Sequence, residues 1–373
     1  MASIRLPEAS IPLQHRDLRD QSYRPADEMP PEYAAGQYEF APTTRKRQVT
    51  VLICSFLAVA MTIGPNFSYG VFQDYYVTSS DSILPPLDAK NRAAVALVGT
   101  LGAGLTWSGS IVINPLMSRV KGNANQKIAT IGCCLMSASY ALAGSSQRLW
   151  QLLLTQGLLY GMGSSMVYFP ILSVAPEYFD RRRGAAMGFI LSGASIGGLI
   201  LSPLVRALLD IIGARWTLRA MALANLMITL PVAISAPPSR SMTRRPTLVN
   251  IRLAKKPAFI LQSLAALLQA SGNFVPMAFL PEFSTVIGYS MSFGATLLAV
   301  NNGVNAVSRV LMGVTADKLG RQNTLVIGVL GSAASGYRNL IWYDGALLFA
   351  SSLCVLGVRG FDALEKREWA WRA

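Results

Sequence analysis

The sequence predicts an all-α integral membrane protein with about ten helices that cross a bilayer. Hydrophobic residues make up 52% of the 373 residues and charged residues only 14%, with a mean hydropathy of +0.38. A soluble domain carries about 25% charged residues, so this chain lacks the charge to cover a water-facing surface. Apolar runs of roughly 20 residues recur along the chain, the length at which a helix crosses the hydrocarbon core. Because the runs are continuous rather than alternating, they indicate helices and not barrel strands.

The positions of these runs define the expected organisation. Residues 1–44 are polar, contain proline and lack a signal-peptide core, so they predict a disordered cytoplasmic tail. An N-terminal six-helix half is expected over 45–236, a basic cytoplasmic linker over 237–256, and an incomplete C-terminal half over 257–373. The clear runs lie near 49–73, 93–116, 126–145, 150–174, 184–206, 215–236, 257–280 and 291–313, and two weaker ones near 323–337 and 340–358.

The charged residues between the runs predict the orientation. The net charge of +14 is spread among these connections rather than gathered on one basic face, which argues against a nucleic-acid partner. With a cytoplasmic N-terminus, the inner segments hold Arg45, Lys46, Arg47, Arg119, Lys121, Lys127, Arg181, Arg182, Arg183, Arg240, Arg244, Arg245, Arg252, Lys255, Lys256, Lys318 and Arg321. The outer segments hold only Lys90, Arg92, Arg148, Arg206 and Arg215. This asymmetry fits the positive-inside rule and favours a multi-pass protein with a cytoplasmic N-terminus.

Residues for enzyme chemistry are nearly absent, so no catalytic residue, cofactor or metal is expected. The only histidine is His15, and there is no CxxC, HExxH or P-loop sequence. All the cysteines lie inside apolar runs, where we interpret them as small buried hydrophobes; they are Cys54, Cys133, Cys134 and Cys354. The expected partners are the lipid bilayer and a small-molecule substrate.

The stretch GVTADKLGRQ, which follows the eighth run, carries the first recognisable motif. It resembles the G-x-x-x-D-[RK]-x-G-R pattern of the major facilitator superfamily, with its key positions at Gly313, Asp317, Lys318, Gly320 and Arg321. Glycine permits a tight turn, and Asp317 can pair with a cation or cap the next helix. The corresponding stretch after the second run, NPLMSRVKGN, has Ser118 where the motif has aspartate.

A second stretch, YFDRRRGAAMGFILSGASIGG, places a cationic cluster before a glycine-rich apolar run. It resembles the fifth-helix signature of the monocarboxylate transporter family, and FSYG at 67–70 resembles that family's first-helix pattern. The runs INPLMSRV and GARWTLRA are similar to the fungal branch of the family. The matching positions are Tyr178, Phe179, Arg182, Arg183, Ala186, Gly188, Gly193 and Gly197. Gly184/Gly188 and Gly193/Gly197 form two G-x-x-x-G pairs, which indicate either close helix packing or a helix that moves against its neighbours during transport.

Polar stripes cross two of the apolar runs. Asn302, Asn305 and Arg309 share one face of the eighth run by their helical spacing. A second stripe on the first run consists of Asn66, Tyr69 and Gln73, and Asn273 joins Gln269 on the seventh. Polar stripes in both halves favour a shared central cavity, although hydrogen bonding between helices explains them too. Asp74 and Glu282 lie at run ends, where we expect them to face water.

The resemblance assigns roles to some of these residues. It implies that Arg309 binds a substrate carboxylate, as guanidinium groups do well. It also implies a proton-handling aspartate and lysine, but Asn305 and Gln73 stand in those positions. Proton–lactate symport is therefore not expected.

The function expected is a carrier, most plausibly of the plasma membrane, that moves a small organic anion, monocarboxylate or related metabolite by alternating access. Efflux of a secondary metabolite is one alternative. Another is a non-transporting sensor or inactive remnant, because the superfamily has twelve spans and the run at 323–337 is short. Its 15 residues span about 22 Å as helix, less than the ~30 Å core. On this reading about ten of the twelve helices are present and the C-terminus is truncated.

Overall fold

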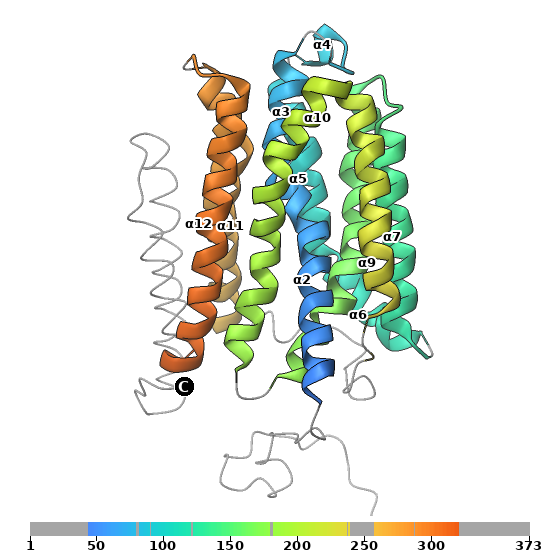
Figure 1. The fold of residues 1–373 in the computed structure, drawn as a ribbon, viewed down its shortest axis with the longest axis vertical. Coiled ribbons are helices and arrows are strands. Elements are labelled where there is room, and N and C mark those ends of the chain that lie inside the picture. Colours follow the sequence, from blue (N-terminus) through green and yellow to red (C-terminus); the bar gives the residue numbers. More distant parts are fainter. Residues whose placement is uncertain are drawn as a thin grey trace, which may run out of the picture. The chain divides into compact units, whose positions relative to one another are not determined.

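The structure is a computed structural model that describes residues 44–320, apart from 80–81, 90, 121, 180–181, 237, 239–256 and 287. Regular structure within these residues is helical throughout (Figure 1). The predicted tail, almost all of the predicted linker and the two weaker runs, 323–337 and 340–358, lie outside the described residues. The same holds for Arg321, the last residue of the glycine–aspartate motif.

The first apolar run forms two helices, α2 (Arg45–Phe67) and α3 (Tyr69–Thr78). They are separated at Ser68, where the backbone N–H bonds to the Gly64 carbonyl at 3.1 Å. Pro65 has no N–H to give to the helical ladder, and an interior proline of this kind disturbs a helix locally. The helix is therefore interrupted for one residue inside the predicted polar stripe, while Arg45–Thr78 together form one candidate span.

The second run is also broken. After the short α4 (Pro86–Ala89), α5 (Arg92–Ser108) and α6 (Ser110–Arg119) meet at Gly109 with a bend of 40°. Together these two helices pass as one broken membrane span by length and composition.

The third and fourth runs pack against each other within the first half. The third is α7 (Ala124–Ala143). The fourth is continuous from α8 (Leu149–Leu152) through a π-helical segment, η2 (Leu153–Leu159), into α9 (Tyr160–Leu172), and a 3₁₀ turn, η3 (Ala175–Tyr178), follows. A π-helical segment inside a helix is uncommon.

The fifth and sixth runs are joined in α10 (Arg183–Ile234), which is 52 residues long. At 1.5 Å per residue this is about 78 Å, more than twice a ~30 Å hydrocarbon core. The helix reverses direction at Gly213, whose φ of +70° favours glycine because a Cβ would be strained there (Figure 1). The predicted turn between 206 and 215 is therefore present, and α10 comprises two spans.

The seventh and eighth runs are α11 (Pro257–Val286) and α12 (Met291–Leu319), and α12 ends at Gly320 with φ of +87°. Each of the eight clear apolar runs thus lies in helix, as predicted. By length and composition, Arg45–Thr78, Leu149–Tyr178 and Arg183–Ile234 can each cross a membrane.

Two ends of the bundle are used as landmarks below. The Arg45 end contains the starts of α2 and α10 and the end of α12 (Figure 1). The Gly213 end contains the end of α3, the reversal of α10, and the connection between α11 and α12. Large apolar side chains on the outside are exposed, as lipid contact requires; Ile111 is 67% and Met227 66% exposed. Cys54 and Cys133 are buried, but Cys134 is exposed, so the expectation that it is buried is wrong.

Helix α10 packs against α2 on one side and against α12 on another. A Cβ at Gly193 would lie 2.5 Å from the Phe56 carbonyl oxygen of α2, and one at Gly197 would lie 2.6 Å from that of Ala60. Nearer the Arg45 end, a Cβ at Gly188 would lie 2.6 Å from the Arg309 carbonyl oxygen of α12. Both glycine pairs therefore lie at close approaches between helices, each pair facing a different neighbour.

We predict that Gly193→Ala destabilises the protein, whereas Gly104→Ala does not. An added methyl at Gly193 meets backbone, and overpacking of this kind costs about 1–3 kcal/mol. Gly104 lies on α5 with nothing within 4 Å of its added Cβ, so alanine there is neutral or stabilises by about 0.5–1 kcal/mol. Thermal unfolding of both purified variants in detergent measures the difference; equal melting temperatures would contradict it.

Candidate functional site

Arg309, halfway along α12, is a half-buried cation with only neutral partners. Its Nε donates to Asn305 Oδ1 at 3.3 Å, and its guanidinium carbon lies 5.6 Å from the centre of the Phe67 ring on α2. Among the described residues, no carboxylate lies within 4 Å of the guanidinium. The amide and the aromatic ring stabilise the cation without neutralising it, so its charge is available to an anion.

Asn302 lies about two turns further toward the Gly213 end and is fully buried. Its Nδ2 donates to the Phe67 carbonyl at 3.4 Å, while its Oδ1 has no hydrogen-bond partner in the described part of the chain. A Cβ at Gly198 would lie 2.6 Å from that Nδ2, so only glycine leaves room for the amide. Asn302 therefore fixes α12 against both α2 and α10 and retains an unused acceptor.

The predicted stripe on the first span is divided among different neighbours. Asn66 is half-buried and donates to the Thr62 carbonyl of its own helix at 3.4 Å. Beyond the break at Ser68, the Tyr69 hydroxyl donates to the Val95 carbonyl of α5 at 2.7 Å. Gln73 is buried and donates through Nε2 to Glu282 Oε2 of α11 at 3.3 Å.

The structure thus brings together Asn302, Asn305 and Arg309, and adds Phe67 to them from α2. It directs Tyr69 and Gln73 to other helices, so a cavity lined by all of the predicted residues stays a prediction. The side chain of Asn273 on α11 lies outside the described part of the structure. Sequence reasoning missed Phe67 as a partner of Arg309, although FSYG was recognised as a motif.

Asp317 joins α12 to the start of α10. Its carboxylate accepts the backbone N–H of Gly184 at 2.7 Å and that of Ala185 at 2.8 Å. These amides lie in the first turn of α10, where N–H groups lack helical partners and the helix dipole attracts negative charge. The sequence predicted that Asp317 could cap the helix that follows it. In the structure Asp317 caps α10, which precedes it in the chain.

The basic residues of both motifs surround this contact. Arg182 precedes the first turn of α10, and Arg182, Arg183 and Lys318 are exposed. No ion pair with Asp317 forms within 4 Å among the residues that the structure describes. The cap is therefore a bond from carboxylate to backbone.

Two carboxylates at the Gly213 end are buried, so the expectation that they face water is wrong. Asp74 is 2% and Glu282 7% exposed. Both lie where α3 and α11 pack against each other, because the helices continue past the ends of the apolar runs to Thr78 and Val286. The positions of Asp74 and Glu282 at the ends of apolar runs suggested exposure to water, but a second helix covers each side chain.

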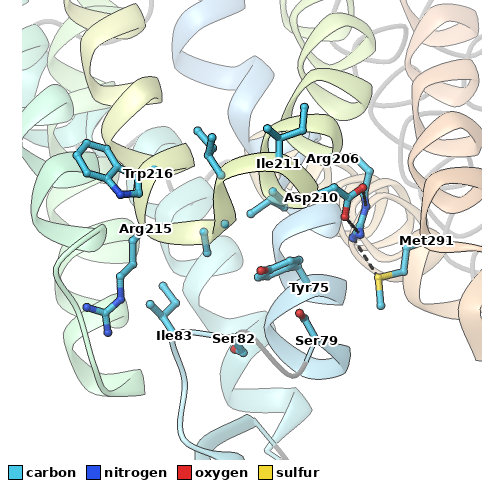
Figure 2. Close-up of a pocket in the computed structure, with 14 residues that line it drawn as sticks. Tyr75, Ser79, Ser82, Ile83, Arg206, Asp210, Ile211, Arg215, Trp216 and Met291 are labelled. Carbon is cyan, nitrogen blue, oxygen red and sulfur yellow. Dashed lines mark hydrogen bonds and ion pairs between the residues drawn. The ribbon is translucent and has the colours of Figure 1, made fainter.

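A pocket of about 570 Å³ lies nearby, between the end of α3, the reversal of α10 and the start of α12 (Figure 2). In it, Arg206 makes two hydrogen bonds to the Asp210 carboxylate of its own helix. Its Nη1 donates to the sulfur of Met291 at 3.0 Å, a weak acceptor. Trp216 and Arg215 lie on the other side of the view in Figure 2.

Three features are typical of a two-part membrane carrier. They are the paired spans, the polar groups between α2, α10 and α12, and the contacts of the first six spans with α11 and α12. The chain belongs to the Major Facilitator Superfamily: the family model matches residues 47–364. It is therefore a multi-pass membrane transporter, from a family whose members are not typically enzymes. The match continues past residue 330, where the resemblance noticed in the sequence ends.

Fungal transporters are among its relatives. The chain is 30% identical over 329 residues to the MFS-type transporter pynF of Aspergillus niger, covering 87% of this chain and 74% of that protein. It is 27% identical to the aspyridones efflux protein apdF of Emericella nidulans, over 74% of this chain and 53% of that protein. None of these findings separates a monocarboxylate-transporter-like subtype from the rest of the superfamily.

A solved structure shares the fold. A bacterial homolog of the human lysosomal transporter Spinster, in an inward-facing and unoccupied conformation, aligns with a TM-score of 0.53 at 15% identity. The alignment covers 85% of this chain and 75% of that one.

We predict that Asp317→Ala destabilises the contact between α12 and α10. Losing a side-chain cap costs about 0.5–2 kcal/mol, and Asp317→Asn, which keeps one oxygen acceptor, should fall between the parent and alanine. Lys318→Ala is the matched control, since it changes the adjacent, exposed residue. Melting temperatures of the purified variants test this; similar values for Asp317→Ala and Lys318→Ala would show that the cap contributes nothing.

Proposed function

We propose that the chain transports a small organic anion by alternating access, with Arg309 as the anchor for the negative charge. The observation that carries this proposal is a half-buried guanidinium with an amide and an aromatic ring beside it and no carboxylate within 4 Å among the described residues. An unneutralised cation inside a membrane protein is costly, and such residues typically mark a substrate pathway. An organic carboxylate is the ligand that a guanidinium binds best.

Alternating access requires that contacts at one end break while those at the other form. At the Arg45 end, Asp317 of α12 holds the start of α10. At the Gly213 end, Glu282 of α11 contacts Gln73 of α3, and Thr285 of α11 contacts Asp74. The two sets link the first six spans to α11 and α12 at opposite ends, which supports opening at either side of Arg309.

The proposed orientation has the Arg45 end in the cytoplasm, with the plasma membrane as the site of action. The described basic residues at this end are Arg45, Lys46, Arg47, Arg119, Lys127, Arg182, Arg183 and Lys318. The positive-inside rule supports this assignment.

Efflux of a secondary metabolite is the second candidate. Two relatives favour it by name: the aspyridones efflux protein of Emericella nidulans and the agnestins efflux protein of Paecilomyces divaricatus, which is 26% identical. Comparing metabolites inside and outside cells with and without the gene separates the candidates. A compound that accumulates inside cells lacking the gene supports export, whereas slower uptake of supplied monocarboxylates supports import.

We predict that Arg309→Ala lowers transport of an anionic substrate about 10- to 100-fold. A hydrogen bond to a charged group contributes about 1.5–3 kcal/mol, and each 1.4 kcal/mol is a factor of ten. Arg309→Lys keeps the charge but loses the planar fork, so its loss should be smaller. The measurement is flux of the compound identified by metabolite comparison, scaled to protein at the membrane.

Arg119→Ala serves as the matched control, because it removes an exposed arginine at the Arg45 end. It should transport like the parent. Unchanged flux in Arg309→Ala, with normal amounts of protein at the membrane, would refute the anchor.

A further inference from the structure

Asp74 is a buried carboxylate without a cation. It is 2% exposed, and no arginine or lysine lies within 4 Å of it among the described residues. Its Oδ1 accepts two hydroxyl groups, from Thr285 of α11 at 3.0 Å and from Thr78 of its own helix at 3.4 Å. A buried ionised carboxylate that lacks a cation is costly, and binding a proton removes that cost.

Glu282, on the facing helix, is compensated differently. Its Oε1 lies 2.8 Å from Arg92 Nη1 of α5, and its Oε2 lies 3.3 Å from Gln73 Nε2 of α3. Glu282 is thus paired with a cation, and its negative charge disfavours a second negative charge on Asp74. Of the two carboxylates, Asp74 is therefore the one placed to bind a proton.

Gln73 gives an independent sign of a missing hydrogen. Its side chain is fully buried against Glu282, and its Oε1 has no donor in the described part of the chain. Buried amide oxygens are normally paired. The site therefore holds an unused hydrogen-bond acceptor beside Glu282.

We propose that Asp74, Glu282 and Gln73 form a proton-binding site, and that a proton on Asp74 holds the Gly213 end closed. The inference rests on the proposed function, since it assigns a control to one end of the carrier. Water at that end supplies the proton, which forms an O–H bond on the Asp74 carboxylate and removes its charge. On opening, Asp74 reaches water and releases the proton to it.

The direction of the effect follows from linkage. In the closed arrangement Asp74 is buried without a cation, so this arrangement binds the proton more tightly than a hydrated, open one. Lower pH therefore favours closure and higher pH favours opening at the Gly213 end. The charged and titratable groups around Asp74 are Tyr75 and Tyr76 on α3, Arg92 on α5, Arg206 and Asp210 on α10, and Glu282 on α11.

Arg206 is the nearest competing influence, since its positive charge favours ionised Asp74. It is already engaged by the Asp210 carboxylate, which it meets through two nitrogens (Figure 2). Asp210 provides a control carboxylate, because its side chain is 49% exposed and paired with Arg206.

The first test is infrared spectroscopy of the full chain, purified into lipid nanodiscs, across a pH titration. The carboxyl C=O stretching band that disappears as pH rises should be lost in Asp74→Asn and kept in Asp210→Asn. Asp74→Glu retains a carboxyl group and should keep a band at a shifted position. This variant shows whether a band is lost because the carboxyl is absent or because the protein has unfolded. A band in Asp74→Asn that equals the parent's would overturn the assignment.

The second test measures opening. Spin labels at Leu87 on α4 and Ser292 on α12, both exposed at the Gly213 end, report the distance across it after alanine replaces the native cysteines. The parent should shift to longer distances as pH rises, and Asp74→Asn should keep the short distance throughout. Asp210→Asn should still shift, but at lower pH, because it frees the Arg206 charge that favours ionised Asp74. An Asp74→Asn protein that shifts like the parent would refute the control of closure.

Neither measurement uses a substrate. The results are therefore separable from those for Arg309→Ala. If Arg309 is not the anchor, the pH titration of Asp74 can still be measured. If Asp74 does not bind the proton, the proposal of anion transport is unaffected.

Discussion

Close contact of α10 with two helices is the constraint on which the rest of the structure depends. The same helix meets α2 through Gly193 and Gly197, and α12 through Gly188, with backbone at each contact. In a bilayer, where burying apolar surface between helices gains little, such close packing supplies much of the association. It also places Phe67 of α2 within reach of Asn302 and Arg309. The candidate site is a consequence of the glycines.

Three charged residues, Asp317, Arg309 and Asp74, have different kinds of partner, and each kind of partner indicates a different role. Asp317 is satisfied by backbone amides at the start of α10, so its charge is fully used in joining helices. Arg309 has an amide and a ring, which leave its charge open to an anion. Asp74 has only hydroxyl groups, which leave it open to a proton. What distinguishes them is the partner, because all three belong to helices of similar composition.

The sequence predicts the helices well and their partners poorly. Length and hydropathy place all eight clear spans, and glycine marks the reversal at Gly213, because these features depend on neighbours in the chain. Partners depend on residues far away: Asp317 bonds to an amide 133 residues earlier, and Gln73 to a carboxylate 209 residues later. Helical spacing grouped Tyr69 and Gln73 with Asn66, but Tyr69 bonds to α5, Gln73 bonds to α11, and Asn66 bonds to its own helix. Nothing local to Asp74 or Glu282 shows that each is covered by the other's helix.

The two ends of the carrier differ chemically in the groups that link its helices. At the Arg45 end the link is a carboxylate that accepts hydrogen bonds from backbone N–H groups beside exposed arginines. At the Gly213 end the link passes through buried carboxylates, one without a cation. As proposed above, the protonation of Asp74 acts on the closure at the Gly213 end. Since a ligand can shift an equilibrium only by its differential affinity for the two states, the proton's effect is confined to the end where Asp74 changes from buried to hydrated.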